Sequence, residues 1–393
     1  MNALRVVLVT PRFWPLVGDT EDAMGDLACG LPRLGAETTV VSARWQTDWP
    51  AFSHFGKTQV HRLHRCGGGR GSRAYYLLSL ARWLRRRRDQ FDLAVVAGMR
   101  FEAYTTLWSL RRTRIPVVLR PEVEDVAWHQ KSLAAASCRR RCRSAAALIA
   151  RDPAIAQALR NAGWPAPQIH PIPDGIPPGR LRKGTGCCEA RRDLANANGD
   201  LTMGVGAPLV VYCGPLQRRA GLIPLVRAWP GVLRQWPAAK LWLIGEGPDR
   251  EPLFQLIRDL EIADCVLLPG SFENLDQIFL AADLLVDPRA AGSLPRVFLQ
   301  AAAAGLPIVA QLNAPWQAHP VLASLIQAVP EDADGQIWGR MIREALCQVP
   351  DRRQQAAQRR RLLSCHSLNR MLRAHLELFE TLTCTPDGCL RHP

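Results

Sequence analysis

The sequence predicts an α/β protein made of two doubly wound units. Short, continuous aliphatic runs alternate with helical stretches across nearly all of the 393 residues. Strands that are apolar on both faces and separated by helices are typical of a parallel sheet covered on both sides. The pattern is interrupted by Pro177–Pro208, which is poor in hydrophobic residues, and then starts again. This restart indicates a second unit of the same kind.

The first half of the chain holds six expected strands and four expected helices. The strands are Arg5–Val9, Thr38–Val41, Leu93–Val96, Pro116–Leu119, Leu148–Ala150 and Ile169–Ile172. The helices are Glu21–Leu34, Tyr75–Arg88, Tyr104–Arg112 and Pro153–Ala162. In open α/β sheets of this kind ligands bind at the carboxyl ends of the strands.

The second half repeats the pattern with five expected strands, Leu209–Tyr212, Leu241–Ile244, Val266–Leu268, Leu284–Val286 and Ile308–Ala310. We therefore expect an N-terminal Rossmann-like domain at 1–180, a linker at 181–207 and a C-terminal Rossmann-like domain at 208–350. A helical segment at 351–382 is expected to pack back toward the N-terminal domain, and 383–393 to form a frayed tail.

The net charge of +15 indicates an anionic partner. Nucleic acid, anionic lipid and sugar diphosphates all qualify on charge alone. No helix-turn-helix, zinc-finger or RNP-type signature supports specific nucleic-acid binding. The alternative is that clusters such as Arg85–Arg88 are solvated helix faces.

Neither the start of the chain nor any apolar run predicts a signal peptide or a membrane span. The run Val6–Val9 is short and Pro11 follows it, and no run reaches bilayer length. We expect a cytoplasmic protein. The cysteines suggest no disulfide framework, and pairs such as Cys138 and Cys142 match no zinc-site spacing.

Residues 288–310 are the most informative segment. They read as a strand end, a tight loop, a helix that opens after Pro295, a Gly305-Leu306-Pro307 stop and another buried strand. The segment resembles the nucleotide-sugar site of group 1 (family 4) glycosyltransferases. The resemblance implies the GT-B architecture, in which two Rossmann-like domains face each other across a cleft.

Both acidic side chains of that family's motif are replaced here. The family has glutamates at the positions of Gly292 and Gln300. Losing a charge-assisted contact that tightens in the transition state costs roughly 2–4 kcal/mol, a rate factor of about 30 to 1000. Backbone N–H groups at the start of the helix can still bind a diphosphate. The resemblance implies donor contacts from this loop and helix at Ser293, Leu294, Arg296, Val297 and Gln300.

The rest of the implied donor site lies in two loops of the second half and one of the first. Arg218 and Arg219 replace a family Arg and Lys at shifted positions, and arginine binds phosphate well; the alternative is that both are exposed loop residues. Gly245 and Gly247 form a Gly-x-Gly turn that the backbone can bring close to a ligand. Gly18 stands where relatives have a glycine near the donor phosphates.

Three further features of the first half leave alternatives open. Asp19, after Gly18, either takes a proton from an acceptor hydroxyl or caps the following helix. Arg120 and Glu122 follow an expected strand and could line the cleft. The helix Tyr75–Arg88 is amphipathic and basic, which fits either contact with an anionic membrane surface or a core-facing stripe.

The resemblance implies a retaining transferase that moves a sugar from a nucleotide-diphosphate donor to the hydroxyl of a glycan, a lipid-linked or a small-molecule acceptor. It implies no cofactor and no metal, and Asp332-Ala-Asp334 is read as a solvated turn. The alternative is a GT-B scaffold with impaired turnover that binds or regulates an active transferase. Peripheral contact with the inner membrane face is expected if the acceptor is lipid-linked.

Overall fold

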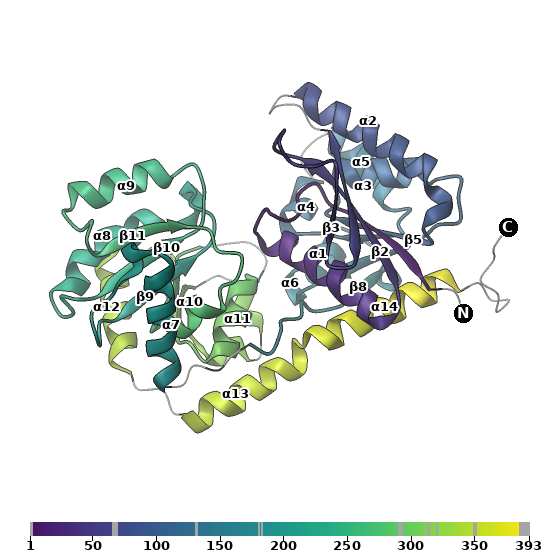
Figure 1. Ribbon diagram of the computed structural model, residues 1–393. Coiled ribbons are helices and arrows are strands. Elements are labelled where there is room, and N and C mark those ends of the chain that lie inside the picture. Colours follow the sequence, from purple (N-terminus) through teal and green to yellow (C-terminus); the bar gives the residue numbers. More distant parts are fainter. Residues whose placement is uncertain are drawn as a thin grey trace. The chain divides into compact units, whose positions relative to one another are not determined.

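The computed structural model describes residues 3–64, 70–129, 133–179, 181, 184–289, 294–312, 315–319, 321–348 and 352–384. The chain forms two compact units (Figure 1). Unit 1 comprises Met1–Gly175 together with Leu368–Pro393, and unit 2 comprises Ile176–Ser367. The described residues include no helix with both the length and the apolar character needed to span a bilayer.

Unit 1 is built on an eight-stranded sheet in the order β3-β4-β2-β1-β5-β6-β7-β8. All described pairings are parallel except the β3–β4 hairpin at one edge. The strands are β1 Arg5–Val9, β2 Glu37–Arg44, β3 Phe52–Phe55, β4 Thr58–His64, β5 Leu93–Ala97, β6 Val117–Arg120, β7 Ala147–Ala150 and β8 Ile169–Pro171. The helices are α1 Asp19–Gly30, α2 Arg70–Arg86, α3 Phe101–Ser109, α4 Val123–Trp128, α5 Leu133–Cys142, α6 Pro153–Asn161 and α14 Leu368–Thr383.

Unit 2 is built on a six-stranded parallel sheet in the order β11-β10-β9-β12-β13-β14. Counted from its first strand this is the order 3-2-1-4-5-6 of a Rossmann sheet. The strands are β9 Leu209–Cys213, β10 Lys240–Ile244, β11 Val266–Gly270, β12 Leu284–Asp287, β13 Ile308–Gln311 and β14 Ile326–Val329. The helices are α7 Gly184–Ala197, α8 Leu222–Leu233, α9 Arg250–Asp259, α10 Asp276–Ala281, α11 Arg296–Ala304, α12 Gly335–Cys347 and α13 Arg352–Cys365. The predicted fold class of two Rossmann-like domains is therefore confirmed.

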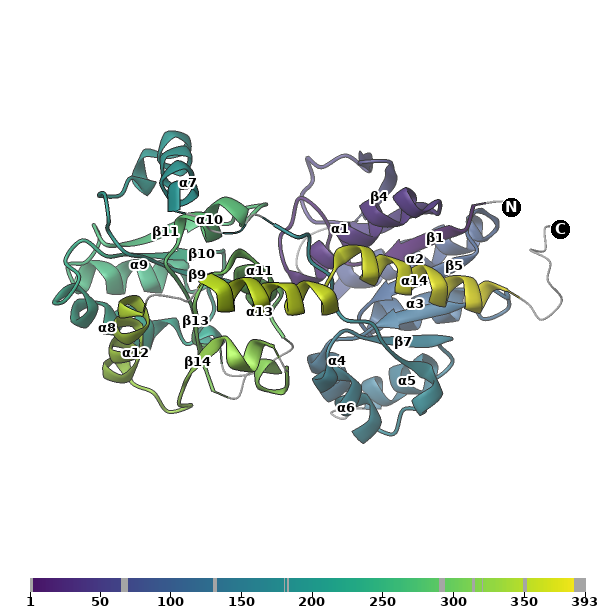
Figure 2. The same cartoon turned by 90° about the horizontal axis from the view of Figure 1, so that it is seen from below.

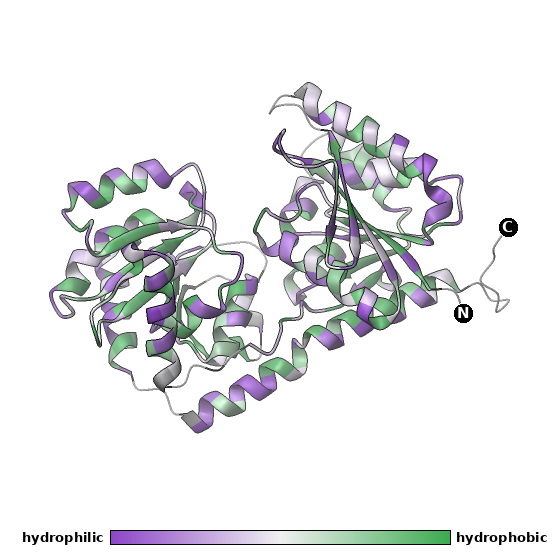
Figure 3. Ribbon diagram, viewed as in Figure 1, coloured by the Kyte–Doolittle hydropathy of each residue, from purple (hydrophilic) through white to green (hydrophobic). Residues whose placement is uncertain are grey.

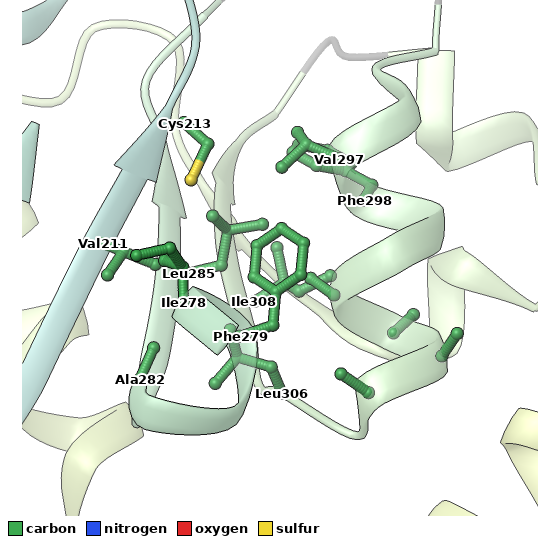
Figure 4. Packing of buried hydrophobic residues seen from close by; sticks show 14 of the residues in the cluster. Val211, Cys213, Ile278, Phe279, Ala282, Leu285, Val297, Phe298, Leu306 and Ile308 are labelled. Atoms are coloured by element: carbon green, nitrogen blue, oxygen red, sulfur yellow. The ribbon is translucent and has the colours of Figure 1, made fainter. Parts of the chain in front are cut away.

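The cores lie on both faces of each sheet. In Figure 3 the strands of both units are mostly hydrophobic, whereas α13 is mostly hydrophilic. Figure 4 shows Phe298 of α11 and Phe279 of α10 packed over Val211 and Leu285 of neighbouring strands, and Phe298 is almost fully buried. Burying one such side chain contributes about 1.5–3 kcal/mol.

The segment expected as a linker holds a helix. α7 buries Ala190 and Leu194 in the core of unit 2. Its Arg191 donates hydrogen bonds to the carbonyl oxygens of Ala281 (2.9 Å) and Ala207 (3.0 Å) and to Asp283 (2.6 Å). The Gly, Arg and Asn content of this segment suggested a linker. The contacts that anchor the helix through Arg191 are polar and are made with residues distant in sequence, so no local apolar pattern revealed them.

The C-terminal helical segment is two helices rather than one. α13 belongs to unit 2, where Gln355 and Arg359 donate to the carbonyls of Gly305 (2.9 Å) and Ala303 (2.7 Å) at the end of α11. α14 belongs to unit 1, and Figure 2 shows it alongside α1. Its Met371, Leu372 and Phe379 lie in the same core cluster as residues of α1.

Three strands escaped the sequence analysis. β3 and β4 form the antiparallel hairpin of unit 1, and β14 is the edge strand of unit 2. β4 alternates buried and exposed residues and carries His61, Arg62 and His64. It therefore lacks the continuous apolar run that marks the central strands.

Candidate functional site

Arg218 and Arg219 lie in a 3-10 turn, Arg218–Ala220, that follows β9. Both side chains are exposed. Gly221 ends this turn with φ +67°, and a Cβ there would lie 2.8 Å from the carbonyl oxygen of Pro288. This close packing fixes the backbone of the turn at the carboxyl edge of the unit 2 sheet, where a Rossmann-like sheet binds its ligand.

Gly245 and Gly247 pack against the loop that follows β9. A Cβ at Gly245 would lie 1.9 Å from the carbonyl oxygen of Gly214, and one at Gly247 would lie 2.1 Å from that of Leu216. The two loops are also joined by hydrogen bonds from Gly214 N to Ile244 O (2.9 Å) and from Leu216 N to Glu246 O (3.0 Å). Glycine is therefore required here by loop packing, independently of any ligand.

An ion pair missed by the sequence analysis braces the end of β12. Asp287 is buried and accepts from Arg289 Nε at 2.8 Å and 3.0 Å. The Arg289 guanidinium lies 5.7 Å from the centre of the Tyr212 ring. Tyr212 in turn donates its hydroxyl to the Pro215 carbonyl at 3.0 Å. The only sequence signal was an aspartate directly after the apolar run of β12.

The residues in and just before α11 that were implied as donor contacts differ in how deeply their side chains are buried. Leu294 and Val297 are 5% and 6% exposed and belong to the hydrophobic core, as the close-up of Val297 shows (Figure 4). Arg296 is also buried, whereas Gln300 is half-buried. The side chains of Leu294 and Val297 therefore pack inside unit 2, so that only their backbone can face a ligand. Gly292 and Ser293 lie outside the described residues.

Gly18 forms the N-cap of α1, and its carbonyl oxygen accepts a hydrogen bond from Asp22 N (2.8 Å). A Cβ at Gly18 would lie 2.5 Å from Oε2 of Glu21. Asp19 is the first helical residue, and the N-cap position belongs to Gly18, which has no side chain. The capping role considered for Asp19 is therefore wrong, and the absence of a side chain at Gly18 leaves room for Glu21.

A pocket of about 480 Å³ opens at the carboxyl edge of the unit 1 sheet. It is formed by residues that follow β1, β2, β5 and β6, with side chains from α2 and α3. β1 and β5 flank the point where the strand order reverses, which is where doubly wound sheets bind ligands. Its charged lining consists of Arg12, Glu21, Arg73, Arg100, Glu102, Glu122 and Asp125.

Each carboxylate of this pocket is paired with an arginine. Glu21 pairs with Arg12. Asp125 accepts from Arg100 Nε at 2.6 Å. Glu102 lies 3.6 Å from Arg73, and Glu122 lies 2.7 Å from Arg151. Arg12, Arg73 and Arg100 remain 40–48% exposed, so they can bind a ligand as well as hold their carboxylates.

Glu122 is held from behind by a buried network. Arg151 donates to it through Nε (3.0 Å) and Nη2 (2.7 Å), and Thr20 Oγ1 lies 3.2 Å away. Arg151 also reaches Asp174 at 3.1 Å, which pairs with the buried Arg120. Burial opposes the charge on Arg151, but Glu122 and Asp174 outweigh it and raise its pKa. Glu122 is thus fixed at the pocket wall.

The sequence analysis considered Arg120 and Glu122 as residues of a cleft between the domains and did not predict this pocket. Glu122 lines the pocket, whereas Arg120 is 2% exposed and lies beneath it in the ion-pair network. The other lining acids, Glu21, Glu102 and Asp125, were missed. Each lies within the first turn of a helix that follows a strand, which was the available signal.

The pocket suits a polyhydroxylated ligand. Four carboxylates and three arginines line it. Ionised carboxylates accept hydrogen bonds from hydroxyl groups, and guanidinium groups donate to ring or hydroxyl oxygens. A carboxylate fixed beside a bound hydroxyl can also take its proton. The near balance of charges makes this pocket a poorer site for a diphosphate than the exposed arginines of unit 2.

Two family models match the chain, one in each unit. The glycosyl transferase 4-like domain model matches residues 20–175, and the model of glycosyl transferases group 1 matches residues 207–331. Among curated proteins, the chain is 33% identical over 150 residues to D-inositol 3-phosphate glycosyltransferase of Nocardia farcinica. That alignment covers 35% of this chain and 32% of the relative.

Solved structures match over almost the whole chain. Sucrose-phosphate synthase from Thermosynechococcus elongatus superposes with a TM-score of 0.77 at 17% identity, over 96% of this chain and 99% of that one. The Anabaena protein HepE, solved with UDP and glucose, gives a TM-score of 0.72 at 16% identity, over 96% and 100%. These likenesses establish the GT-B architecture of two Rossmann-like domains. The two family models show that residues 20–175 form a glycosyl transferase 4-like domain and that residues 207–331 belong to the glycosyl transferases group 1.

Proposed function

We propose that the chain is a retaining glycosyltransferase that moves a sugar from a nucleotide-diphosphate donor to an acceptor hydroxyl. The observation that carries the proposal is the match of two family models, in chain order, to two Rossmann-like units. Each unit has its own candidate ligand site at the carboxyl edge of its sheet. The reaction needs no cofactor and, in this proposal, no catalytic metal.

The donor is assigned to unit 2. Arg218 and Arg219 are exposed beside the β9 loop and would neutralise the diphosphate. The N-cap residue of α11 is Pro295, which offers no side-chain cap, and the positive end of a helix favours the same anion. The structure solved with UDP and glucose suggests a uridine nucleotide as the first donor to test. Gly245, Gly247, Ser293, Arg296 and Gln300 complete the proposed donor residues.

The acceptor is assigned to the pocket of unit 1. Its carboxylates and guanidinium groups match the hydroxyls of a sugar or cyclitol, and the name of the Nocardia farcinica relative makes inositol phosphate a reasonable first acceptor. Glu122 is the proposed group that orients the acceptor hydroxyl, because Arg151 and Thr20 fix its position. A lipid-linked acceptor would bring the exposed Tyr75 and Leu78 of α2 toward a membrane.

Gln300 supports a second candidate, a scaffold with impaired turnover. It is half-buried and takes the place of a family glutamate, so it offers a neutral carbonyl to a donor hydroxyl in place of a carboxylate. The expected cost, about 30- to 1000-fold in rate, would leave donor binding in place. Binding and turnover must therefore be measured separately.

Calorimetry with UDP, GDP, ADP and their common sugars separates the two candidates. We expect selective binding of one nucleotide by the native chain, weakened about tenfold or more in the Arg218→Ala/Arg219→Ala variant because phosphate contacts are lost. Arg234→Ala is the control. This variant removes an exposed arginine at the C-terminal end of α8, the opposite end of that helix from the β9 loop.

A Gly292→Glu/Gln300→Glu variant then tests whether the donor site has lost its ability to bind a nucleotide sugar. Binding and turnover by the native chain support the enzyme. Absence of nucleotide binding by the native chain, with binding restored in the double variant, supports the scaffold.

A further inference from the structure

Unit 1 contains a buried cluster of metal-ligating side chains that the proposed reaction does not use. One ring nitrogen of His129 and the sulfurs of Cys138 and Cys142 lie within 4.8 Å of one another. All three side chains are buried, at 0–2% exposure. The two cysteines are four residues apart on α5, so they share one face of that helix.

The cluster surrounds a single carbonyl oxygen. His129 Nε2 lies 2.7 Å from Met99 O, Cys138 Sγ lies 3.5 Å from it and Cys142 Sγ lies 3.6 Å from it. The two sulfurs are 3.9 Å apart. Cys138 Sγ also lies 3.2 Å from Arg100 O, so its thiol has a second acceptor beside the cluster.

These separations are close to the edges of a tetrahedral zinc site. With Zn–S bonds of about 2.3 Å and Zn–N or Zn–O bonds of about 2.0 Å, the sulfur–sulfur edge is about 3.8 Å and the sulfur–oxygen edge about 3.5 Å. The nitrogen–oxygen edge of about 3.3 Å is longer than the 2.7 Å found here, so this edge would open by about 0.6 Å on binding.

We propose that His129, Cys138 and Cys142 bind a zinc ion, with the Met99 carbonyl oxygen as the fourth ligand. Binding displaces one proton from each thiol to solvent, and the imidazole proton resides on Nδ1. Two thiolates, one neutral imidazole and Zn²⁺ sum to zero charge, which suits a buried site.

The site joins three segments behind the unit 1 pocket. Met99 belongs to the turn between β5 and α3, His129 follows α4, and the cysteines belong to α5. Met99 N donates to Asp125 Oδ2 at 3.1 Å, and Asp125 lines the pocket. The zinc ion would thus fix the turn that positions this carboxylate. The sequence spacing did not reveal the site, because His129 lies nine positions before Cys138.

Metal analysis of the purified full chain tests the proposal. After growth with zinc and dialysis into metal-free buffer, we expect inductively coupled plasma mass spectrometry to find about one zinc per chain. Cys138→Ser, Cys142→Ser and His129→Gln should each reduce this to less than about 0.2 per chain. Cys213→Ala, which removes an equally buried thiol in unit 2, and Cys187→Ser/Cys188→Ser should leave it unchanged.

A cobalt spectrum of the native chain keeps the test informative if the variants misfold. Exchange of zinc for Co²⁺ should give thiolate-to-cobalt charge-transfer bands and intense visible bands of a tetrahedral site. Two thiols should also resist alkylation until a chelator is added. Zinc content that is negligible in the native chain, or equal in the native chain and the three variants, would overturn the proposal, as would a cobalt spectrum without thiolate bands.

Discussion

At the scale of single residues, the pocket of unit 1 depends on carboxylates whose charge is balanced by specific arginines. Glu122 is the clearest case, because Arg151 behind it is 5% exposed and would lose a charged partner at 2.7 Å if Glu122 were neutral. We predict that Glu122→Gln lowers the free energy of unfolding by about 2–3 kcal/mol, below the usual cost of breaking a fully buried pair because Glu122 is 22% exposed. Urea unfolding measures this, with Glu124→Gln, which is exposed on the same helix, as the control. Equal midpoints for the two variants would contradict the proposed anchoring.

A second prediction at this scale concerns glycine. Gly245 has φ +141°, and a Cβ there would overlap the Gly214 carbonyl, so Gly245→Ala should cost about 2–4 kcal/mol. Gly186→Ala, inside α7 with no atom within 4 Å of the added Cβ, should instead stabilise unit 2 by about 0.5–1 kcal/mol. Thermal unfolding of both variants reads out the contrast, and a loss of stability in both would show that α7 does not tolerate the change.

At the scale of elements, α2 has a core face and an exposed face. Tyr76, Leu80 and Leu84 are buried, whereas Tyr75 and Leu78 are 55% and 70% exposed, next to exposed Arg82, Arg85 and Arg86. If this face meets an anionic membrane, Leu78→Asp should weaken binding to phosphatidylglycerol vesicles by about tenfold and spare stability. Flotation with these vesicles measures the effect, and neutral phosphatidylcholine vesicles are the control. Unchanged flotation of the variant would leave α2 with a purely structural role.

The elements also show what sequence reasoning can reach. Buried strands such as β5 and β9 were predicted because each is a continuous apolar run. β4 was missed because polar residues, among them the buried Thr58 and Arg62, interrupt its apolar run. α7 was missed because its anchors, Ala281 and Ala207, are contacts outside the helix. The unit 1 pocket was not predicted, although Glu122, one of its lining residues, was considered as a cleft residue. Glu122 follows a strand end, but its partner Arg151 is 29 residues away and only the fold brings them together.

At the scale of the whole molecule, each unit carries a buried histidine that makes stability depend on pH. Burial lowers the pKa of His319 in unit 2 to about 4, with help from His366, whose Nε2 lies 2.7 Å from that of His319. Burial likewise lowers the pKa of His375 in unit 1 to about 4. The unfolded chain binds these protons below about pH 6.5 and the folded chain only below about pH 4.

Stability should therefore be full above about pH 6.5 and fall as the pH drops toward 4, by up to about 1.4 kcal/mol per pH unit for each histidine. Melting temperatures between pH 8 and pH 4.5 measure the slope. His375→Gln should flatten it for unit 1, whereas His54→Gln, on the exposed edge hairpin, should not. A melting temperature that does not change over this range would contradict the neutral state assigned to both rings.

The most direct test of the proposed function is sugar transfer itself, read by NMR. The full chain is incubated with UDP-, GDP- and ADP-sugars and with free sugars, inositol and inositol phosphate as acceptors. We expect slow transfer from one donor class, with an α-linked product from an α-linked donor, and loss of at least about tenfold in Glu122→Gln. No product from any donor, in a chain that binds the nucleotide tightly, would contradict the enzyme and favour the binding scaffold. An inverted anomeric centre would contradict retention.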